Sequence, residues 1–170
     1  AGWEEMKKKK GIDAGPPWAY KGWSKKGAGG RAESHYPTMD IAAIKALPVG
    51  ELADKDCALF LWITFPMLRE AWGVMDAWGF TFKTVAFVWI KQCRKSDGLF
   101  TGMGYWTRAN AEICLLATRG RPKRAARDVK QVILSHVERH SQKPEEARRR
   151  IEALMGDVPR IELFARASPP

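Results

Sequence analysis

The sequence predicts an α/β fold with a mostly parallel central sheet and helices on both faces, for three reasons. Residues 57–63 form a continuous apolar run of strand length, which is typical of a strand buried on both faces. Residues 66–78 then change to a helical period of apolar side chains. Strand and helix patterns continue to alternate along the chain, and ligands in such folds bind at the carboxyl ends of the strands.

The other elements follow from similar patterns. Residues 12–14 are predicted as a short strand that ends at Gly15, because the two prolines that follow cannot donate to a central strand ladder. Asp40 is expected to cap a short helix that ends before Pro48. Four strands and one helix complete the set: strands over 84–90, 113–118, 131–134 and 160–165, and a helix over 144–155.

Length and composition favour one domain over residues 1–170, since 45% of the residues are hydrophobic and no repeat or linker divides them. The longest strongly apolar stretch is far shorter than the roughly 20 residues that span a bilayer, and no signal peptide is expected. Three cysteines without CxxC spacing predict reduced thiols, buried at Cys57 and Cys114, and no metal site. We therefore expect an intracellular protein.

Positive charge is the clearest feature of the composition. Lysine and arginine number 29 against 19 acidic residues, which gives a net charge of +10 and favours a polyanionic partner such as nucleic acid. The cations gather in three predicted loops, which are expected to border one crevice. They are Lys21, Lys25, Lys26 and Arg31 in the first loop, Arg94 and Lys95 in the second, and the run from Arg119 to Lys130 in the third. The alternative for each loop is a solvated surface.

Pro16-Pro17-Trp18, directly after the first predicted strand, is the most specific local signal. Two prolines fix the backbone and leave carbonyl groups without ladder partners at the strand end, where an exocyclic amine could donate to them. The adjacent indole offers a flat face on which a purine could stack. The alternative is an ordinary strand-ending turn with a buried tryptophan.

Seven motifs, taken in their order along the chain, resemble those of the permuted N6-adenine methyltransferases. These are relatives of the catalytic subunit of the messenger-RNA adenosine methylase, and they include bacterial and phage DNA methylases. The resemblance covers residues 11–168. The motifs are Pro16-Pro17-Trp18, His35-Tyr36-Pro37-Thr38-Met39, Phe60-Leu61-Trp62-Ile63, Phe87-Val88-Trp89-Ile90-Lys91, Gly104-Tyr105-Trp106-Thr107-Arg108, His140-Ser141-Gln142-Lys143-Pro144 and Ile161-Glu162-Leu163-Phe164-Ala165-Arg166.

The resemblance implies a Rossmann-like methyltransferase fold that moves a methyl group from S-adenosyl-L-methionine to the exocyclic N6 of adenine in DNA. The family's motif is usually Asp-Pro-Pro-Trp. Its acidic side chain and the following proline carbonyl hold the amine, and its aromatic residue stacks on the base. In this chain the catalytic positions are therefore Gly15, Pro16, Pro17 and Trp18. Much of the rate would come from alignment in a dry, polar site.

Substrate residues also follow from the resemblance. Tyr36 matches an aromatic residue on the substrate side, although a tyrosine before proline can also be a plain loop anchor. Trp106 matches a position near the substrate. The basic residues Lys21, Lys25, Lys26 and Arg31 are expected to hold phosphates.

Cofactor residues come from two arguments. Asn110, Phe164 and Arg166 match positions around the cofactor in the family, with a core phenylalanine and a surface arginine as the alternatives for the last two. Ser141 and Lys143 stand at a predicted helix start, which favours anionic groups, so they are expected to serve the cofactor carboxylate or a phosphate.

The chain departs from the family at the acidic position, which is Gly15. Asp13 faces the same side of the strand but lies ~6–7 Å further back, so it is a poor substitute. Losing such a transition-state interaction typically costs on the order of 100- to 1000-fold in rate, so we expect reduced or lost activity. The family also continues past the last strand into a cofactor-contacting turn where this chain has Pro169-Pro170, and weaker cofactor binding is expected.

Two functions stay open. The first is a DNA N6-adenine methyltransferase, of bacterial or phage type because the chain is compact, with DNA favoured over RNA. Such an enzyme is expected in the cytoplasm of a bacterium or a phage-infected cell. The second is a non-catalytic nucleic-acid-binding or partner subunit of such an enzyme. A dimer stays open as well, and a membrane partner is not expected.

Overall fold

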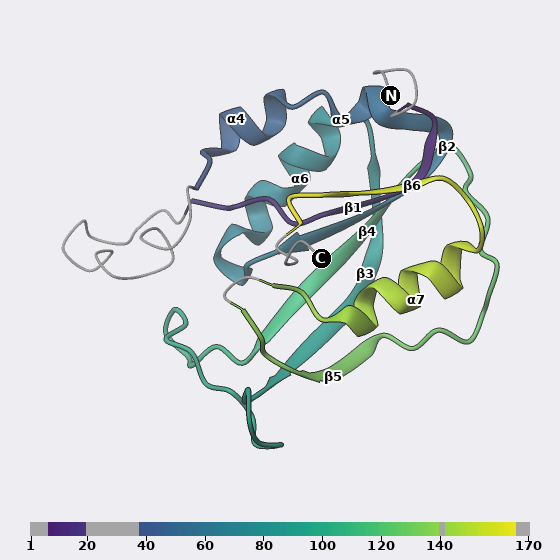
Figure 1. The fold of residues 1–170 in the computed structure, drawn as a ribbon. Coiled ribbons are helices and arrows are strands. Elements are labelled where there is room, and N and C mark those ends of the chain that lie inside the picture. The colour runs from purple at the N-terminus through teal and green to yellow at the C-terminus, as the bar shows by residue number, and fades with distance from the viewer. Residues whose placement is uncertain (1–6, 20–37, 140–141, 166–170) are drawn as a thin grey trace.

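A computed structural model of the chain describes residues 7–19, 38–139 and 142–165 (Figure 1). The strands in this part are β1 (Lys9–Ala14), β2 (Ala53–Ile63), β3 (Thr81–Gln92), β4 (Ala111–Arg119), β5 (Val132–His136) and β6 (Arg160–Leu163). The helices are α4 (Ile41–Ala46), α5 (Val49–Leu52), α6 (Leu68–Ala77) and α7 (Glu145–Met155), with a 3-10 turn, η1 (Phe65–Met67), before α6.

The six strands form one sheet in the order β5-β3-β4-β2-β1-β6. β1 is parallel to both β2 and β6, and β3 is parallel to β5. β4 lies between β2 and β3 and is antiparallel to both. The carboxyl ends of five strands therefore lie at one edge of the sheet, together with the amino end of β4. We call this edge the carboxyl edge.

The prediction of a mostly parallel sheet is wrong, because the sheet is mixed and two of its five strand pairs are antiparallel. The cause is the connection between β3 and β4. A parallel neighbour needs a crossover over one face of the sheet, usually through a helix. Residues 93–110 form no helix, and the chain turns back beside β3 instead.

Apolar side chains cover both faces of the sheet, as the sequence predicts. Leu59 and Leu61 of β2 belong to the core that packs on α4 and α6. Phe60 and Trp62 point to the other face and belong to the core that includes Ile151 of α7. Successive residues of a strand face opposite sides, so one continuous apolar run serves both cores. Figure 1 shows α4 and α6 on one side of the sheet and α7 on the other.

Local signals account for most of the element ends. Asp40 caps α4 by accepting a hydrogen bond from the Ala43 N–H at 2.8 Å. Gly79 follows α6 with a φ of +84°, a left-handed conformation that favours glycine. On α6, Val74 is buried, whereas Trp72 is 40% exposed. Within the described ranges, every helix falls short of the length and apolarity that a membrane span requires.

Candidate active site at the carboxyl edge

The carboxyl edge brings together residues that are far apart in the sequence. Gly15 follows β1 and Thr64 follows β2. Lys91 is near the end of β3, and Phe164 follows β6 with a φ of +62°. Glu112 is at the start of β4 and reaches the same edge because that strand runs in the opposite direction. Five strands thus contribute to one site.

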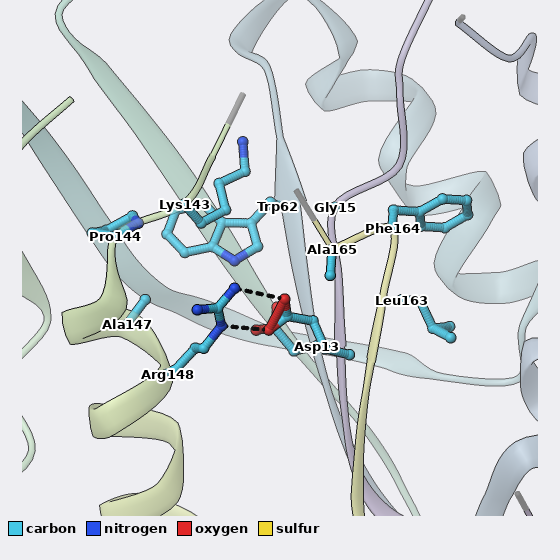
Figure 2. Close-up of a pocket in the computed structure, with 11 residues that line it drawn as sticks. Asp13, Gly15, Trp62, Lys143, Pro144, Ala147, Arg148, Leu163, Phe164 and Ala165 are labelled. Carbon is cyan, nitrogen blue, oxygen red and sulfur yellow. Dashed lines mark hydrogen bonds and ion pairs between the residues drawn. The ribbon is translucent and has the colours of Figure 1, made fainter. Parts of the chain in front are cut away.

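A small pocket lies beside Gly15, between the ends of β1 and β6 and the start of α7 (Figure 2). We call it the Gly15 pocket, and its volume is about 20 Å³. It is lined by Asp13, Gly15, Trp62, Lys143, Pro144, Ala147, Arg148, Glu162, Leu163, Phe164 and Ala165.

Gly15 has room for a side chain directed at this pocket. A Cβ atom built on it would lie 3.7 Å from Cε of Lys143 and 3.9 Å from Cβ of Trp62, which are ordinary van der Waals contacts. The Gly15 N–H donates to the Leu163 carbonyl at 3.3 Å, so β6 fixes the backbone here. An aspartate at this position would therefore fit without displacing a neighbour's backbone.

The proline corner after Gly15 is held by backbone hydrogen bonds. The Pro16 carbonyl accepts from the Trp18 N–H at 2.9 Å, and the Pro17 carbonyl accepts from the Met39 N–H at 2.8 Å. A carbonyl oxygen has two lone pairs, so each oxygen keeps the capacity to accept a second hydrogen bond from a ligand.

Trp18 is buried, and the stacking role expected of it does not agree with this position. Its indole is 5% exposed and packs in the core on the α4 and α6 side of the sheet. Its Nε1–H donates to the Trp62 carbonyl at 2.9 Å. Burial removes the large ring from water while the backbone carbonyl satisfies its N–H. Trp18 is thus part of a strand-ending turn, the alternative left open by the sequence.

Asp13 shares the Gly15 pocket, as strand alternation predicts. It lies in register with Glu162 of β6, which Arg148 holds through two hydrogen bonds of 2.7 and 3.0 Å, the dashed lines in Figure 2. Burial and then the charge of Glu162 raise the pKa of Asp13 to about 7. The Nε1 of Trp62 is buried and lacks a hydrogen-bond partner of normal geometry, although it lies close enough to Asp13 to lower this pKa slightly.

A cluster of three charges adjoins the pocket. Lys143 Nζ donates to one carboxylate oxygen of Glu112 at 2.6 Å, and Lys91 Nζ lies 2.6 Å from the other. Burial would raise the pKa of Glu112, but the two lysines outweigh it and hold this pKa at about 2. Each ammonium also lies over an indole, Lys143 over Trp62 at 5.6 Å and Lys91 over Trp89 at 5.2 Å. Two cations against one anion leave this cluster, the lysine–glutamate cluster, with one net positive charge.

A larger cavity of about 480 Å³ opens next to this cluster, and we call it the open cavity. This volume lies within the range of about 300 to 1,000 Å³ that is common for small-molecule sites. The Thr64 hydroxyl in its lining has no hydrogen-bond partner among the described residues. The lining residues are Thr64, Phe65, Pro66, Lys91, Gly104, Tyr105, Thr107, Arg108, Ala109, Asn110, Ala111 and Glu112.

The structure brings some of the predicted site residues together. Lys143 and Phe164 line the Gly15 pocket with Gly15 itself, and Asn110 lines the open cavity. Trp106 is 92% exposed, in the loop that borders the open cavity. The remaining site predictions fall outside the described residues and stay predictions. They concern Tyr36, Lys21, Lys25, Lys26, Arg31, Ser141 and Arg166.

The basic run from Arg119 to Lys130 does not border this site, contrary to expectation. Arg119 ends β4 opposite Cys57, near the start of β2, and donates to the Gly50 carbonyl. The Arg121 N–H donates to Asp56 at 2.8 Å. Because β4 is antiparallel to its neighbours, its end lies at the opposite edge of the sheet from Gly15. Arg94 and Lys95 follow β3 and belong to the carboxyl edge.

Sequence reasoning missed Lys91 as a site residue, and the family resemblance placed Glu112 near the site only as part of the segment 110–112. Lys91 appears only as the last letter of an apolar motif, and Glu112 stands just before the apolar residues 113–117. A charged residue inside a buried strand costs free energy unless it is paired, so both positions carried a signal. Their pairing with each other and with Lys143 depends on the direction of β4, which the sequence alone did not give.

In comparisons with a family model and with known proteins, the sequence is similar to methyltransferases. The sequence model of the MT-A70 family matches residues 11–170. The chain is 31% identical to the Type II methyltransferase M.MunI of Mycoplasma sp, over 94% of this chain and 73% of that protein. It is 30% identical to an N(6)-adenosine-methyltransferase MT-A70-like protein of Drosophila melanogaster and 28% identical to the human N(6)-adenosine-methyltransferase catalytic subunit METTL3. Each alignment covers 91% of this chain but only about a quarter of the relative, 24% and 25% respectively.

Proposed function

The chain belongs to the MT-A70 family, and from this premise we propose that its site transfers a methyl group to the exocyclic N6 of adenine in DNA, with low activity in the present sequence. The observation that carries the proposal is the position of the Gly15-Pro16-Pro17 corner. It adjoins a pocket at the carboxyl edge, next to a buried cationic cluster and an open cavity.

The residues at this edge fit S-adenosyl-L-methionine chemically. When bound, the cofactor supplies an electrophilic methyl group on a sulfonium. Lys143 offers a cation to its carboxylate, Asp13 and Glu162 offer acceptors to its ammonium, and Phe164 offers an apolar wall. Asn110, in the lining of the open cavity, offers an amide to a hydroxyl or a ring nitrogen. The Gly15 pocket, at about 20 Å³, is too small for the whole cofactor, so we place only the charged amino-acid end of the cofactor beside it and the rest along the carboxyl edge.

The open cavity is the proposed adenine site. Two members of the lysine–glutamate cluster line this cavity, and they offer a cationic donor, Lys91, and a carboxylate acceptor, Glu112. The amino group of adenine is a weak nucleophile because its lone pair is conjugated with the ring. Acceptors that bind its two hydrogens direct that lone pair toward the electrophile, so alignment rather than a strong base supplies the rate.

In this chain the Pro16 carbonyl keeps a free lone pair for one of those hydrogens, but Gly15 supplies no side-chain acceptor for the other. Asp13 cannot take over that role at its place in β1, because it lies one strand repeat away and faces Glu162. This difference is the physical reason for the low activity that we propose.

Replacing Gly15 by aspartate tests the proposal. The new Cβ atom would make ordinary contacts with Lys143 and Trp62, and the carboxylate would be directed at the Gly15 pocket. We expect methyl transfer from labelled S-adenosyl-L-methionine to unmethylated bacterial DNA to rise by roughly 100- to 1000-fold, the usual worth of one preorganised transition-state partner. Digestion of the DNA to nucleosides would identify the product as N6-methyladenine.

Gly15→Ala is the matched control, because it adds the Cβ without the carboxylate. Equal rates in the alanine and aspartate variants would show that filling the pocket, and not the carboxylate, matters. Equal rates in the original protein and Gly15→Asp would remove the missing acid from the explanation. Methylation of RNA but not of DNA would correct the substrate.

A second candidate is a non-catalytic nucleic-acid-binding or partner subunit, and the absence of a side chain at Gly15 favours it. A calorimetric titration with S-adenosyl-L-methionine separates the two. Millimolar or absent cofactor binding in both the original protein and Gly15→Asp, together with tight and salt-sensitive DNA binding, would support the second candidate.

A further inference from the structure

The loop between β3 and β4 has a defined conformation although residues 93–110 contain no helix or strand. The Cys93 N–H donates to the Gly98 carbonyl at 2.8 Å and the Phe100 N–H to the Lys91 carbonyl at 2.9 Å. Further along, the Gly102 N–H donates to the Ala109 carbonyl at 2.7 Å. These bonds fold the loop back on itself, so that its tip projects from the carboxyl edge.

Large apolar side chains are concentrated on this loop. Of nine large hydrophobic side chains exposed among the described residues, five belong to it. They are Leu99 (52% exposed), Phe100 (36%), Met103 (54%), Tyr105 (63%) and Trp106 (92%). Exposed apolar surface gathered in one place is typical of an interaction site.

Trp106 is the extreme case, because its backbone is strained as well as its side chain exposed. Its φ is +71°, a left-handed conformation that is unusual for a bulky residue. The turn around it is tight: the Thr107 N–H donates to the Tyr105 carbonyl at 2.9 Å. At Gly104, which has a φ of +65°, a Cβ atom would collide with the Thr107 carbonyl oxygen. A strained backbone that keeps an indole exposed to water is expected where the side chain contacts a binding partner.

The surroundings of Trp106 identify that partner as nucleic acid. Its neighbours Tyr105, Thr107 and Arg108 line the open cavity, so the indole stands at the rim of the proposed adenine site. Arg94 and Lys95 in the same loop add positive charge for phosphates. The loop therefore carries cations in its first part and exposed apolar side chains further along.

We propose that Trp106 is a wedge that enters the base stack of duplex DNA and occupies the space left by the adenine turned out into the open cavity. This rests on the proposed function. An adenine inside a duplex must leave the stack to be modified, and unstacking costs free energy. Apolar side chains inserted between base steps are a known way to unstack them. An indole stacks on any base, so the wedge works without reading sequence.

The experiment compares Gly15→Asp with Gly15→Asp/Trp106→Ala on unmethylated bacterial DNA, native and heat-denatured. Neither arm needs a known target sequence. The wedge is needed only where a base must be removed from a duplex. We expect Trp106→Ala to lower methylation of duplex DNA by about tenfold, in line with the worth of one base–aromatic stack, and to lower methylation of denatured DNA less than threefold.

Trp72→Ala is the matched control, because Trp72 is also exposed but lies on α6, where it packs against Phe82. It should leave the duplex-to-denatured ratio unchanged. Trp106→Phe keeps a flat apolar ring and should recover most of the duplex activity. Equal losses on both forms of DNA, or no loss on either, would overturn the wedge.

A second readout does not depend on catalysis. A side chain that intercalates unwinds the duplex, so a closed circular plasmid relaxed by topoisomerase in the presence of the original protein should change its linking number. Trp106→Ala should bind with a smaller change. If Gly15→Asp methylates no nucleic acid, the proposed function fails, and the linking number alone decides on the wedge. An unchanged linking number with bound original protein would then reject it.

Discussion

At the residue scale, two positions determine the properties of the site: Asp13 within β1, and Gly15 directly after the end of β1. Gly15 leaves open space where a carboxylate would face Lys143, whereas Asp13 keeps a carboxyl group that is crowded by Glu162 and held at a pKa of about 7. In the proposed function Gly15 limits the rate of methyl transfer, whereas the pKa of Asp13 makes the stability of the fold depend on pH. The two effects are independent because they concern different properties of the protein.

The raised pKa of Asp13 predicts a stability that falls with rising pH. Between about pH 4 and pH 7 the folded protein keeps a proton that the unfolded chain releases, so the folded state binds more protons and unfolding becomes easier as pH increases. Between pH 5 and pH 8 this amounts to at most about 3 kcal/mol, at 1.36 kcal/mol per pH unit. Urea unfolding of the original protein and Asp13→Asn measures it.

Asp13→Asn should lose this pH dependence, since an amide does not titrate. Asp76→Asn is the control, because Asp76 is exposed on α6 and away from the pocket. It should follow the original protein at every pH. The same slope in all three proteins would mean that Asp13 is ionised in the folded state.

At the element scale, the reversed direction of β4 creates the site. The start of β4 brings Glu112 to the carboxyl edge, where β3 supplies Lys91 and the segment before α7 supplies Lys143. The lysine–glutamate cluster thus ties three elements together. Without Glu112, two partly buried ammonium groups would repel each other at this junction.

Glu112→Gln should destabilise the fold by about 3 kcal/mol, because removing one partner of a buried ion pair leaves an uncompensated charge. The contribution of Glu112 should be present above about pH 4.5 and disappear as the pH falls toward 2, since the lysines lower its pKa in the folded state. Chemical unfolding followed by circular dichroism at pH 7 and pH 3 tests both statements.

Glu145→Gln is the matched control. Glu145 pairs with Arg148 on the surface and is 57% exposed, so its loss should cost less than about 1 kcal/mol. A similar cost for both variants would mean that the lysine–glutamate cluster is weakly coupled to folding.

The elements themselves were largely predictable, and the reasons are physical. Periodicity located every strand of the described part and the helices α4, α6 and α7, because burial imposes it on the sequence. The short helix α5 was missed, as its four residues are too few to show a period. Strand direction was not predictable for β4, since a polar connection without a helix permits either a return or a crossover.

At the scale of the whole molecule, two groups of basic residues in the described part of the chain lie at opposite edges of the sheet. Arg94, Lys95 and Arg108 lie in the loop that leaves the carboxyl edge, and the run that begins at Arg119 lies at the other edge. Both groups are basic, but they differ in position relative to the proposed site. Their contributions to DNA binding can therefore be separated.

Replacing Lys95 and Arg108 by glutamine should lower the slope of log affinity against log salt by about 2, because each lost phosphate contact removes about one unit. Replacing Lys123 and Arg124 removes the same charge at the opposite edge and should leave the slope nearly unchanged. Fluorescence anisotropy with a labelled duplex, measured at salt concentrations from roughly 50 to 300 mM, gives the slope for each pair of substitutions. Equal reductions would mean that DNA also covers the second edge.

The candidate site was predictable only in part. Gly15, Lys143 and Phe164 were identified from the motifs and share one pocket. The argument that Trp18 stacks on a purine failed, because a local motif does not reveal which face of the sheet an indole joins. The family assignment is supported instead by the match over residues 11–170.

The return of the chain from β3 to β4 has an evolutionary consequence. Both ends of the intervening loop are anchored in adjacent central strands, and the loop touches neither of the two apolar cores. Its length and sequence can therefore change, or be exchanged with that of a relative, while the scaffold persists. Divergence in target preference should accumulate there first.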